Sequence, residues 1–151
     1  VVDNSSAWRM EKDIPLVVPE ANPEALGNHG GIIANPNCST IQVMPVLKVL
    51  ADKYGLKRVV YSTYQAVAGS GQKGIDDLEA NLKGEPSKGY PYQIAFNLIP
   101  HIDVFLDNGY TKEEIKMVEE TRKILGLPEL KVTATCVRVP VRMGHAVSVN
   151  V

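Results

Sequence analysis

One cysteine of this chain stands where a thiol could act as a nucleophile. Cys38 lies in the turn Asn35–Thr40, directly before an apolar helical pattern that starts at Ile41. Backbone amides at the start of a helix lack partners within the helix and carry partial positive charge, so they favour the thiolate over the thiol. A single cysteine is, however, more often an inert buried side chain. The turn by itself leaves both interpretations open.

The two cysteines and three histidines of the chain do not indicate a metal site. His29, His101 and His145 are isolated and lack any metal-ligand spacing. Cys38 and Cys136 do not form a CxxC pair, and a reducing, cytoplasmic setting is a better expectation for them than a disulfide. We therefore expect no metal site in this chain.

Composition excludes several function classes. The chain has 151 residues, of which 44% are hydrophobic, enough for one domain with its own core. Sixteen basic and seventeen acidic residues give a net charge of -1, and the two signs are interleaved. The positive surface that nucleic acid requires is therefore not expected. No apolar run approaches the roughly 20 residues that a membrane span needs, so we expect no membrane partner either.

The elements that must position the cysteine turn follow from hydrophobic periodicity. Apolar residues recur at helical spacing from Ile41 to Ala51, and Gly55 ends this predicted helix. Pro45 should kink the helix if it extends back to Cys38. Residues 56–63 have the Val- and Tyr-rich composition of a strand, and a glycine loop at 68–71 and a short helix follow.

The second half of the chain has a clear helix start. Thr111 and Glu114 form a capping box, which predicts a helix that continues to Leu125. Two alternating stretches, 132–139 and 146–151, predict strands. Helices and strands mix without regular βαβ alternation, so we expect an α+β fold with helices packed on a mixed, largely antiparallel sheet. No GxGxxG motif follows a strand, which argues against a dinucleotide-binding domain within most of this chain.

Six stretches that span nearly the whole chain, in order, resemble the aspartate-β-semialdehyde dehydrogenase family. They are residues 3–10 (DNSSAWRM), 18–20 (VPE), 35–40 (NPNCST), 63–66 (TYQA), 100–103 (PHID) and 136–145 (CVRVPVRMGH). The resemblance implies a glyceraldehyde-phosphate-dehydrogenase-like C-terminal domain. It also implies that residues 1–34 are the tail end of a nucleotide-binding domain with a linker, and that residues 35–151 are the catalytic and dimerisation domain. With no initial Met and a last strand cut short, we expect part of a larger protein.

The resemblance also implies a reaction. It is the NADP-dependent, reversible reductive dephosphorylation of L-aspartyl 4-phosphate to L-aspartate 4-semialdehyde, in lysine, threonine and methionine biosynthesis. The Cys38 thiolate would attack the acyl phosphate, release phosphate and leave a thioester. Hydride from NADPH would then give a thiohemiacetal, which collapses to the aldehyde. Covalent capture divides one difficult transfer into two easier steps. The resemblance further implies assembly as a homodimer or homotetramer.

Two further catalytic roles follow from the family. His145 would be the acid/base, since an unperturbed imidazole suits proton transfer near neutrality. Gln65 would orient the reacting group or a water beside Cys38. Without the resemblance, His145 would be a turn histidine in a polar niche, and Gln65 a solvated residue at a strand end.

The substrate-binding roles come from the resemblance as well. Arg138 would hold the substrate carboxylate, for which its planar fork is suited. Glu113 would bind the substrate amine, and Lys116, with Arg9 and Asn37, would bind phosphate. Otherwise Arg138 would form a surface salt bridge, and Glu113 and Lys116 an exposed helix pair worth little.

The loop at 68–71 resembles the segment beside the nicotinamide half of NADP. Family members commonly have Ser-Gly where this chain has Ala68-Gly69, so Gly69 is the better cofactor ligand and Ala68 the weaker one. Arg142 receives no role and is expected on the surface. His101 and Asp103 are expected to serve the structure or the subunit contact, and Cys136 to be inert.

Three alternatives remain. The chain could belong to another thiol-dependent acyl-phosphate reductase, such as N-acetylglutamyl-phosphate reductase or a relative of glyceraldehyde-phosphate dehydrogenase. As an isolated fragment it could be a non-catalytic, self-associating domain. A thiol hydrolase would use cysteine and histidine without needing Arg138.

Overall fold

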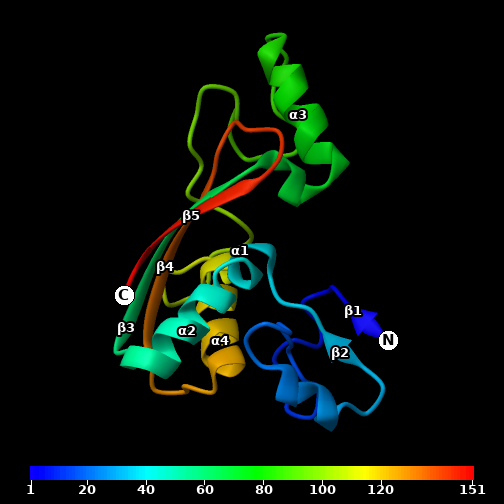
Figure 1. Cartoon of the computed structure of the whole chain (residues 1–151). Coiled ribbons are helices and arrows are strands. Elements are labelled where there is room, and N and C mark those ends of the chain that lie inside the picture. The colour runs from blue at the N-terminus through cyan, green and yellow to red at the C-terminus, as the bar shows by residue number, and fades with distance from the viewer. The chain divides into compact units, whose positions relative to one another are not determined.

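The structure is a computed structural model of residues 1–151. It contains a three-stranded sheet with the strand order β4-β3-β5 (Figure 1). The strands are β3 (Arg58–Gln65), β4 (Lys131–Arg138) and β5 (His145–Asn150). Val139 N–H donates to the Gln65 carbonyl at the end of both β3 and β4, so these two strands run parallel. Arg58, at the start of β3, donates to Asn150 at the end of β5, so β5 runs antiparallel. The predicted α+β fold with a mixed sheet is confirmed.

The chain divides into two compact units. Unit 1 consists of Val1–Val60, Ile115–Thr133 and Val149–Val151, and unit 2 consists of Tyr61–Glu114 and Ala134–Ser148. Unit 1 contains a second, two-stranded sheet, in which β1 (Val2–Asp3) pairs in parallel with β2 (Ile33–Ala34). A 3₁₀ helix, η1 (Pro23–Asn28), lies between these two strands in the sequence.

The helix predicted after the cysteine turn is broken in two. α1 (Cys38–Ile41) is a single turn, and α2 (Met44–Tyr54) begins after Val43 with Pro45 in its first turn. Proline is tolerated there because the first N–H groups of a helix have no partner within the helix. Instead of the predicted kink at Pro45, the helix is interrupted at residues 42–43, just before the turn that contains Pro45. Gly55 ends α2 as expected.

The predicted capping box starts α4 (Lys112–Leu125). Thr111 N–H donates to Glu114 Oε2 at 2.7 Å, and Glu114 N–H donates to Thr111 Oγ1 at 3.3 Å. The two hydrogen bonds satisfy donors that a helix start otherwise leaves unpaired. The other oxygen of the buried Glu114 accepts Cys136 N–H of β4 at 3.0 Å. One carboxylate thus caps the helix and holds a strand of unit 2.

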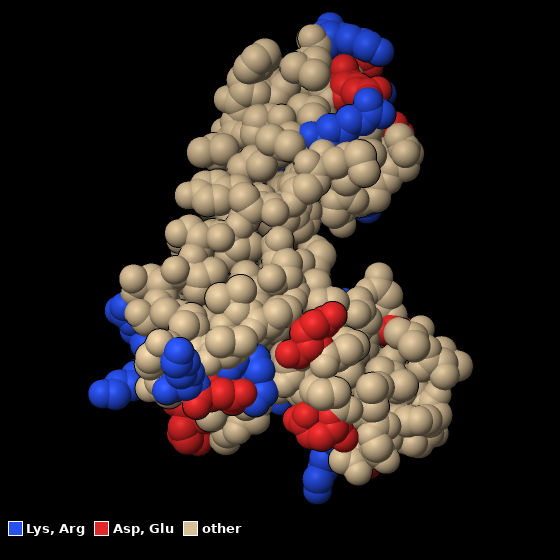
Figure 2. Space-filling view, in the orientation of Figure 1, with Lys and Arg blue, Asp and Glu red and all other residues tan.

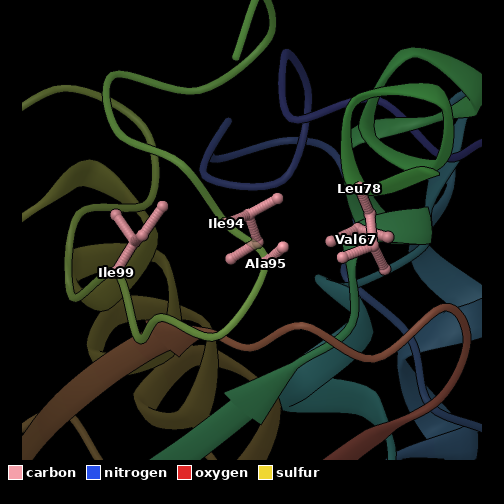
Figure 3. Close-up of a cluster of buried hydrophobic side chains, with 5 residues drawn as sticks. All are labelled: Val67, Leu78, Ile94, Ala95 and Ile99. Carbon is pink, nitrogen blue, oxygen red and sulfur yellow. The ribbon is translucent and has the colours of Figure 1, made fainter. Parts of the chain in front are cut away.

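Unit 2 has a small apolar core beyond the end of β3. Here η2 (Val67–Ser70) and α3 (Gln72–Leu82) pack with the segment 94–99 (Figure 3). The buried members of this core are Val67, Leu78, Ile94, Ala95 and Ile99. Gly74 of α3 is required by close packing, because a Cβ there would lie 2.4 Å from the Val67 carbonyl oxygen. The core fixes the loop that follows β3.

Charges of both signs lie close together on the surface. On the face in Figure 2 acidic and basic side chains neighbour one another, and no large area of one sign is visible. None of the helices combines the length and the apolar character that crossing a membrane would require.

A buried carboxylate of α3 holds the irregular segment that follows this helix in unit 2. Asp77 of α3 is 4% exposed and accepts Lys88 N–H at 2.6 Å and Tyr90 N–H at 3.2 Å. Burial raises the pKa of Asp77, but hydrogen bonds from Lys88, Ser87, Gly89 and Tyr90 outweigh it and leave the pKa below its ordinary value. The charged form is therefore the one that the folded state prefers.

We expect Asp77 to make the stability of the protein depend on pH. Because its folded-state pKa is depressed, its contribution is present above the unfolded-state pKa of about 4 and is lost as the pH falls through the folded-state value. Asp77→Ala should lower the free energy of unfolding by about 1–3 kcal/mol at pH 7. Urea unfolding of both proteins between pH 7 and 3 measures this difference, and a difference that stays constant over that range would contradict the assignment.

Candidate functional site

The backbone of Ala66 binds two of the predicted site residues. It follows β3 directly, and its N–H donates to His145 Nδ1 at 2.9 Å. Its carbonyl oxygen accepts Arg138 Nη1 at 2.8 Å. Arg138 ends β4 and His145 begins β5, so both neighbours of β3 contribute a side chain at the same end of the sheet. The structure therefore brings His145 and Arg138 together.

The hydrogen bond from Ala66 selects one tautomer of His145. Nδ1 must present a lone pair to the N–H group, so in the neutral ring the proton lies on Nε2. Nε2 is the nitrogen that lies toward Gly69, since a Cβ on Gly69 would stand 3.2 Å from it. His145 therefore offers a hydrogen-bond donor beside the glycine loop.

Gly69 leaves room for both of these side chains. A Cβ built at this position would lie 2.8 Å from Arg138 Nη1, as well as meeting the imidazole. Contacts shorter than about 3 Å force a displacement. The exposed Gly69 is the one predicted cofactor ligand that touches this cluster, while Ala68 is half-buried and its N–H donates to the Arg142 carbonyl at 3.2 Å.

Gln65 and Glu113 form a second pair in unit 2. Gln65 Nε2 donates to Glu113 Oε1 at 3.1 Å, and Gln65 Oε1 accepts the Thr63 hydroxyl at 2.9 Å. All three side chains are buried. The alternation of β3 places Gln65 on the same face as Val59, Tyr61 and Thr63, which explains its burial. The solvated strand-end interpretation of Gln65 is wrong, because both ends of its amide are fixed by protein groups.

The buried Arg138 and Glu113 also contradict the alternatives that placed them on the surface. Arg138 is 6% exposed and Glu113 is 6% exposed, so neither belongs to an ordinary surface ion pair. By contrast, Arg142 pairs with Glu79 at 3.3 Å with both side chains largely exposed, as expected for a surface arginine. Such a pair contributes little to stability.

In unit 1 the cysteine turn lies beside a buried ion pair. Arg9 Nη1 donates to Glu120 Oε1 at 3.1 Å, and the backbone N–H of Asn37 donates to Glu120 Oε2 at 2.7 Å. The side chain of Asn37 caps α1 by accepting Ser39 N–H at 2.9 Å. Three residues predicted for phosphate binding and catalysis, Arg9, Asn37 and Cys38, therefore belong to one local arrangement.

The expected effect of the helix start on Cys38 needs correction. Cys38 is exposed and is the first residue of α1, but α1 has only four residues. The partial charge at a helix terminus comes from many aligned peptide groups, so a single turn supplies little of it. Neither Cys38 nor Cys136 forms a disulfide, and Cys136 is buried in β4.

The remaining predicted residues lie as follows. Lys116 is half-buried on α4. The His101 ring contacts the Phe105 ring at 4.5 Å in unit 2. No group of three or more His, Cys, Asp and Glu side chains is placed to hold a metal ion.

Sequence reasoning missed two groups that hold the site residues. One is the backbone of Ala66, whose contacts no side-chain pattern can reveal. The other is Glu120, whose signal is present in the helix period. Glu113, Lys116, Glu120 and Lys123 follow spacings of three, four and three residues, which places them on one stripe of α4. A stripe of alternating charge normally indicates a solvent-exposed face. Here Glu113 and Glu120 are buried.

Adding a methyl group at Gly69 should disturb Arg138 and His145 without unfolding the protein. The clashing atoms are the ends of two side chains that can move, and the backbone of Gly69 needs no left-handed conformation. In Gly69→Ala we expect the NMR signals of the His145 ring to shift, while the melting temperature changes little. Gly27→Ala, where a Cβ meets nothing within 4 Å, is the matched control. Unchanged His145 signals in Gly69→Ala would contradict the close approach.

Comparison with known proteins agrees with the predicted family. Residues 47–151 match the family described as "Semialdehyde dehydrogenase, dimerisation domain", and residues 1–29 match "Semialdehyde dehydrogenase, NAD binding domain". The aspartate-semialdehyde dehydrogenase of Aquifex aeolicus is 57% identical over 99% of this chain and 47% of its own length. The chain thus spans about half the length of the curated relatives it matches.

Solved structures give the same result. The crystal structure of aspartate semialdehyde dehydrogenase II complexed with ASA from Vibrio cholerae has a TM-score of 0.94 and 53% identity, over 99% of this chain and 47% of that one. The aspartate semialdehyde dehydrogenase with NADP from Candida albicans has a TM-score of 0.73 and 32% identity, over 99% and 42%. These matches confirm the predicted glyceraldehyde-phosphate-dehydrogenase-like α+β fold. With the family match over residues 47–151, they show that the chain belongs to the aspartate-semialdehyde dehydrogenase family.

Proposed function

We propose that the protein to which this chain belongs is an NADP-dependent aspartate-semialdehyde dehydrogenase. It would interconvert L-aspartyl 4-phosphate and L-aspartate 4-semialdehyde, and so serve lysine, threonine and methionine biosynthesis. The observation that carries the proposal is the backbone of Ala66, whose N–H and carbonyl groups hold a histidine and a buried arginine at the end of one sheet. The related Vibrio cholerae enzyme was crystallised in a complex with ASA, which supports the same substrate here.

The domain boundaries are part of the proposal. Residues 1–34 would be the end of a nucleotide-binding domain with its linker, and residues 35–151 the catalytic and dimerisation domain. The matches of residues 1–29 and 47–151 to two different families support a change of domain between them. A chain with so little of a nucleotide-binding domain is expected to be inactive when isolated.

Cys38 is the nucleophile in this proposal. In the reductive direction its thiolate attacks the acyl carbon of the aspartyl phosphate, the C–O bond to phosphate breaks, and a thioester remains on Sγ. Exposure of Cys38 at the start of α1 supports this role, because the sulfur must reach the substrate. After reduction to a thiohemiacetal, the C–S bond breaks and releases the aldehyde and the thiolate.

His145 and Gln65 manage the proton and the position of the reacting group. In its present tautomer His145 carries a proton on Nε2, the form that can donate to an oxygen on which negative charge develops. Gln65 is held by Thr63 and Glu113, so its amide has a fixed orientation. Fixed dipoles need no reorganisation when charge develops, which lowers the barrier.

The charged groups select the substrate. Arg138 would bind the carboxylate through guanidinium nitrogens, and a buried arginine does so more strongly than one in water. Glu113 would bind the substrate amine. Lys116, Arg9 and Asn37 would bind phosphate, and Arg9 is already oriented by Glu120 and the Asn35 carbonyl.

NADP would lie against Gly69, with Ala68 as a weaker neighbour. The absence of a Cβ at Gly69 leaves a flat backbone surface beside His145, which fits an approaching planar ring. When bound, this cofactor supplies the hydride.

A second copy of the chain is the proposed protein partner, in a homodimer or homotetramer. The segment 92–106 of unit 2 is held by buried anchors at Ile94, Ile99 and Ile102. Its other large apolar side chains are exposed, and they include Tyr92, Phe96, Leu98, Val104 and Phe105. Ordered, exposed apolar side chains of this number are typical of a protein interface. The match of residues 47–151 to a dimerisation domain supports self-association.

Removal of the Cys38 thiol should abolish turnover. We expect the full-length protein to reduce NADP with aspartate semialdehyde and phosphate, and not with the N-acetylglutamyl analogue. Cys38→Ala should lower kcat by about a thousandfold or more, with an unchanged circular dichroism spectrum. Cys136→Ala is the control, because it removes a buried thiol from the core and should cost stability rather than activity. Substantial turnover by Cys38→Ala would exclude the covalent route.

Replacement of two exposed phenylalanines should weaken self-association. Phe96 and Phe105 are 88% and 56% exposed, so serine at both positions leaves the core of unit 2 intact. Sedimentation equilibrium of the full-length protein should show a dissociation constant raised at least about tenfold. The control replaces Val46 and Val49, both 63% exposed on α2, by serine. Equal effects of the two pairs would show that the segment 92–106 is not the interface.

A further inference from the structure

Glu120 is a buried carboxylate that connects two segments predicted to act on phosphate. It lies on α4 in unit 1, is 1% exposed, and uses its two oxygens on different partners. Oε1 accepts Arg9 Nη1 at 3.1 Å, and Oε2 accepts Asn37 N–H at 2.7 Å. Both are charge-assisted hydrogen bonds in a site without solvent, where such bonds are strongest. The carboxylate thus fixes the distance between the Arg9 guanidinium and the backbone next to Cys38.

Arg9 is held through all three nitrogens of its guanidinium. Besides the bond from Nη1 to Glu120, Nε donates to the Asn35 carbonyl at 2.9 Å, and Nη2 donates to the Asn4 carbonyl at 2.9 Å. Lys123, one turn after Glu120, donates from Nζ to the carbonyls of Arg9, Glu11 and Ile14 at 2.8, 2.8 and 3.0 Å. α4 therefore holds the Arg9 segment twice, by a carboxylate on the side chain and by an ammonium on the backbone.

Two hydrogen bonds at Asn37 order the start of the cysteine turn. Its side chain caps Ser39 N–H, and its own N–H donates to Glu120. Of these two, only the bond to Glu120 joins the turn to α4. The turn needs such support, because Ser39 and Thr40 are fully buried and their hydroxyl groups have no hydrogen-bond partner, which is unfavourable.

We propose that Glu120 is the positioning residue that sets Arg9 and the Cys38 turn in one geometry for the phosphate group. This role rests on the proposed function, in which Arg9 and Asn37 bind phosphate and Cys38 attacks the acyl carbon. Glu120 is buried, so it would act without touching the substrate. It acts by holding the Arg9 guanidinium and the Asn37 backbone in fixed directions, so that a phosphate meets the guanidinium and the Asn37 side-chain amide without rearrangement.

The variant Glu120→Gln separates this role from a purely electrostatic one. Glutamine has the same shape but one acceptor oxygen, so it can serve Arg9 or Asn37 N–H and must turn its NH₂ group toward the other donor. If Glu120 positions the two groups, phosphate binding weakens. If Glu120 only neutralises Arg9, its loss leaves a stronger positive charge and phosphate binding tightens. The two roles predict opposite signs.

The experiment measures phosphate binding in two ways with the full-length protein. The first is the KM for phosphate in the oxidative direction. The second needs no turnover and measures the rate at which iodoacetamide alkylates Cys38 as inorganic phosphate is added. For Glu120→Gln we expect the KM and the protecting phosphate concentration to rise about tenfold, the scale of one lost charge-assisted hydrogen bond. Glu120→Asp keeps the charge but shortens the side chain, and should show a rise in the same direction if Gln fails to fold.

Asp77→Asn is the matched control for the loss of a buried carboxylate. Asp77 also accepts two backbone N–H groups, but it belongs to unit 2, whereas the residues predicted to bind phosphate belong to unit 1. Asp77→Asn should lose stability and keep the wild-type KM for phosphate. If folded Glu120→Gln needs the same phosphate concentration as the wild type to protect Cys38 from alkylation, or a lower one, the proposal is overturned. If the wild type itself lacks turnover with aspartate semialdehyde, the proposed function fails, while the alkylation experiment still decides whether Glu120 orders the turn.

Discussion

The backbone of Ala66 is hydrogen-bonded by a side chain on each side, and the placement of Arg138 and His145 depends on it. Sheet pairing carries β3 as far as Gln65, whose carbonyl accepts Val139 N–H. Ala66 follows the strand directly, and its N–H donates to His145 while its carbonyl oxygen accepts Arg138. Because Ala66 is fully buried, only a small side chain fits there. The site residues are thus aligned by a backbone group, which cannot rotate as a side chain can.

Burial of charge is the second constraint, and the fold meets it with hydrogen bonds. A buried charge is costly unless its oxygens or N–H groups find partners. Arg9, Glu113, Glu114, Glu120 and Arg138 are all buried, and each has a hydrogen-bond partner within the protein. Those partners are largely backbone groups and each other, so the charges are held without solvent. Charged groups held in this way act more strongly on a ligand than solvated ones, because water would otherwise weaken their field.

The sequence predicted the elements well where the signal was local. The capping box at Thr111 and Glu114, the end of α2 at Gly55 and the disruption at Pro45 each follow from interactions within a few residues. The burial of Gln65 was also within reach, since it continues the alternation of Val59, Tyr61 and Thr63. The interpretation of Gln65 as solvated followed the usual preference of glutamine for solvent instead of this alternation. The contact of Ala66 with His145 could not be predicted, because it joins residues 79 positions apart through the backbone.

The polar stripe of α4 shows why charge patterns mislead when they are interpreted alone. Glu113, Lys116, Glu120 and Lys123 alternate in sign along one face, as in a helix stabilised by exposed ion pairs. In the structure three of them bind partners elsewhere in the chain. Glu113 accepts a hydrogen bond from Gln65, and Glu120 accepts hydrogen bonds from Arg9 and Asn37. Lys123 donates to three backbone carbonyl oxygens.

Burial lowers the pKa of Lys123, an effect that Glu11 partly offsets. Lys123, at the half-exposed end of the stripe, is therefore partly desolvated. A helix places residues at fixed intervals, so Glu120 and Lys123 can hold the Arg9 segment and the cysteine turn of unit 1 at defined spacing. These two residues therefore act as a scaffold for segments that have little regular structure of their own. Charged residues serve this purpose better than apolar ones because a carboxylate or ammonium group fixes the direction of its partner as well as the contact.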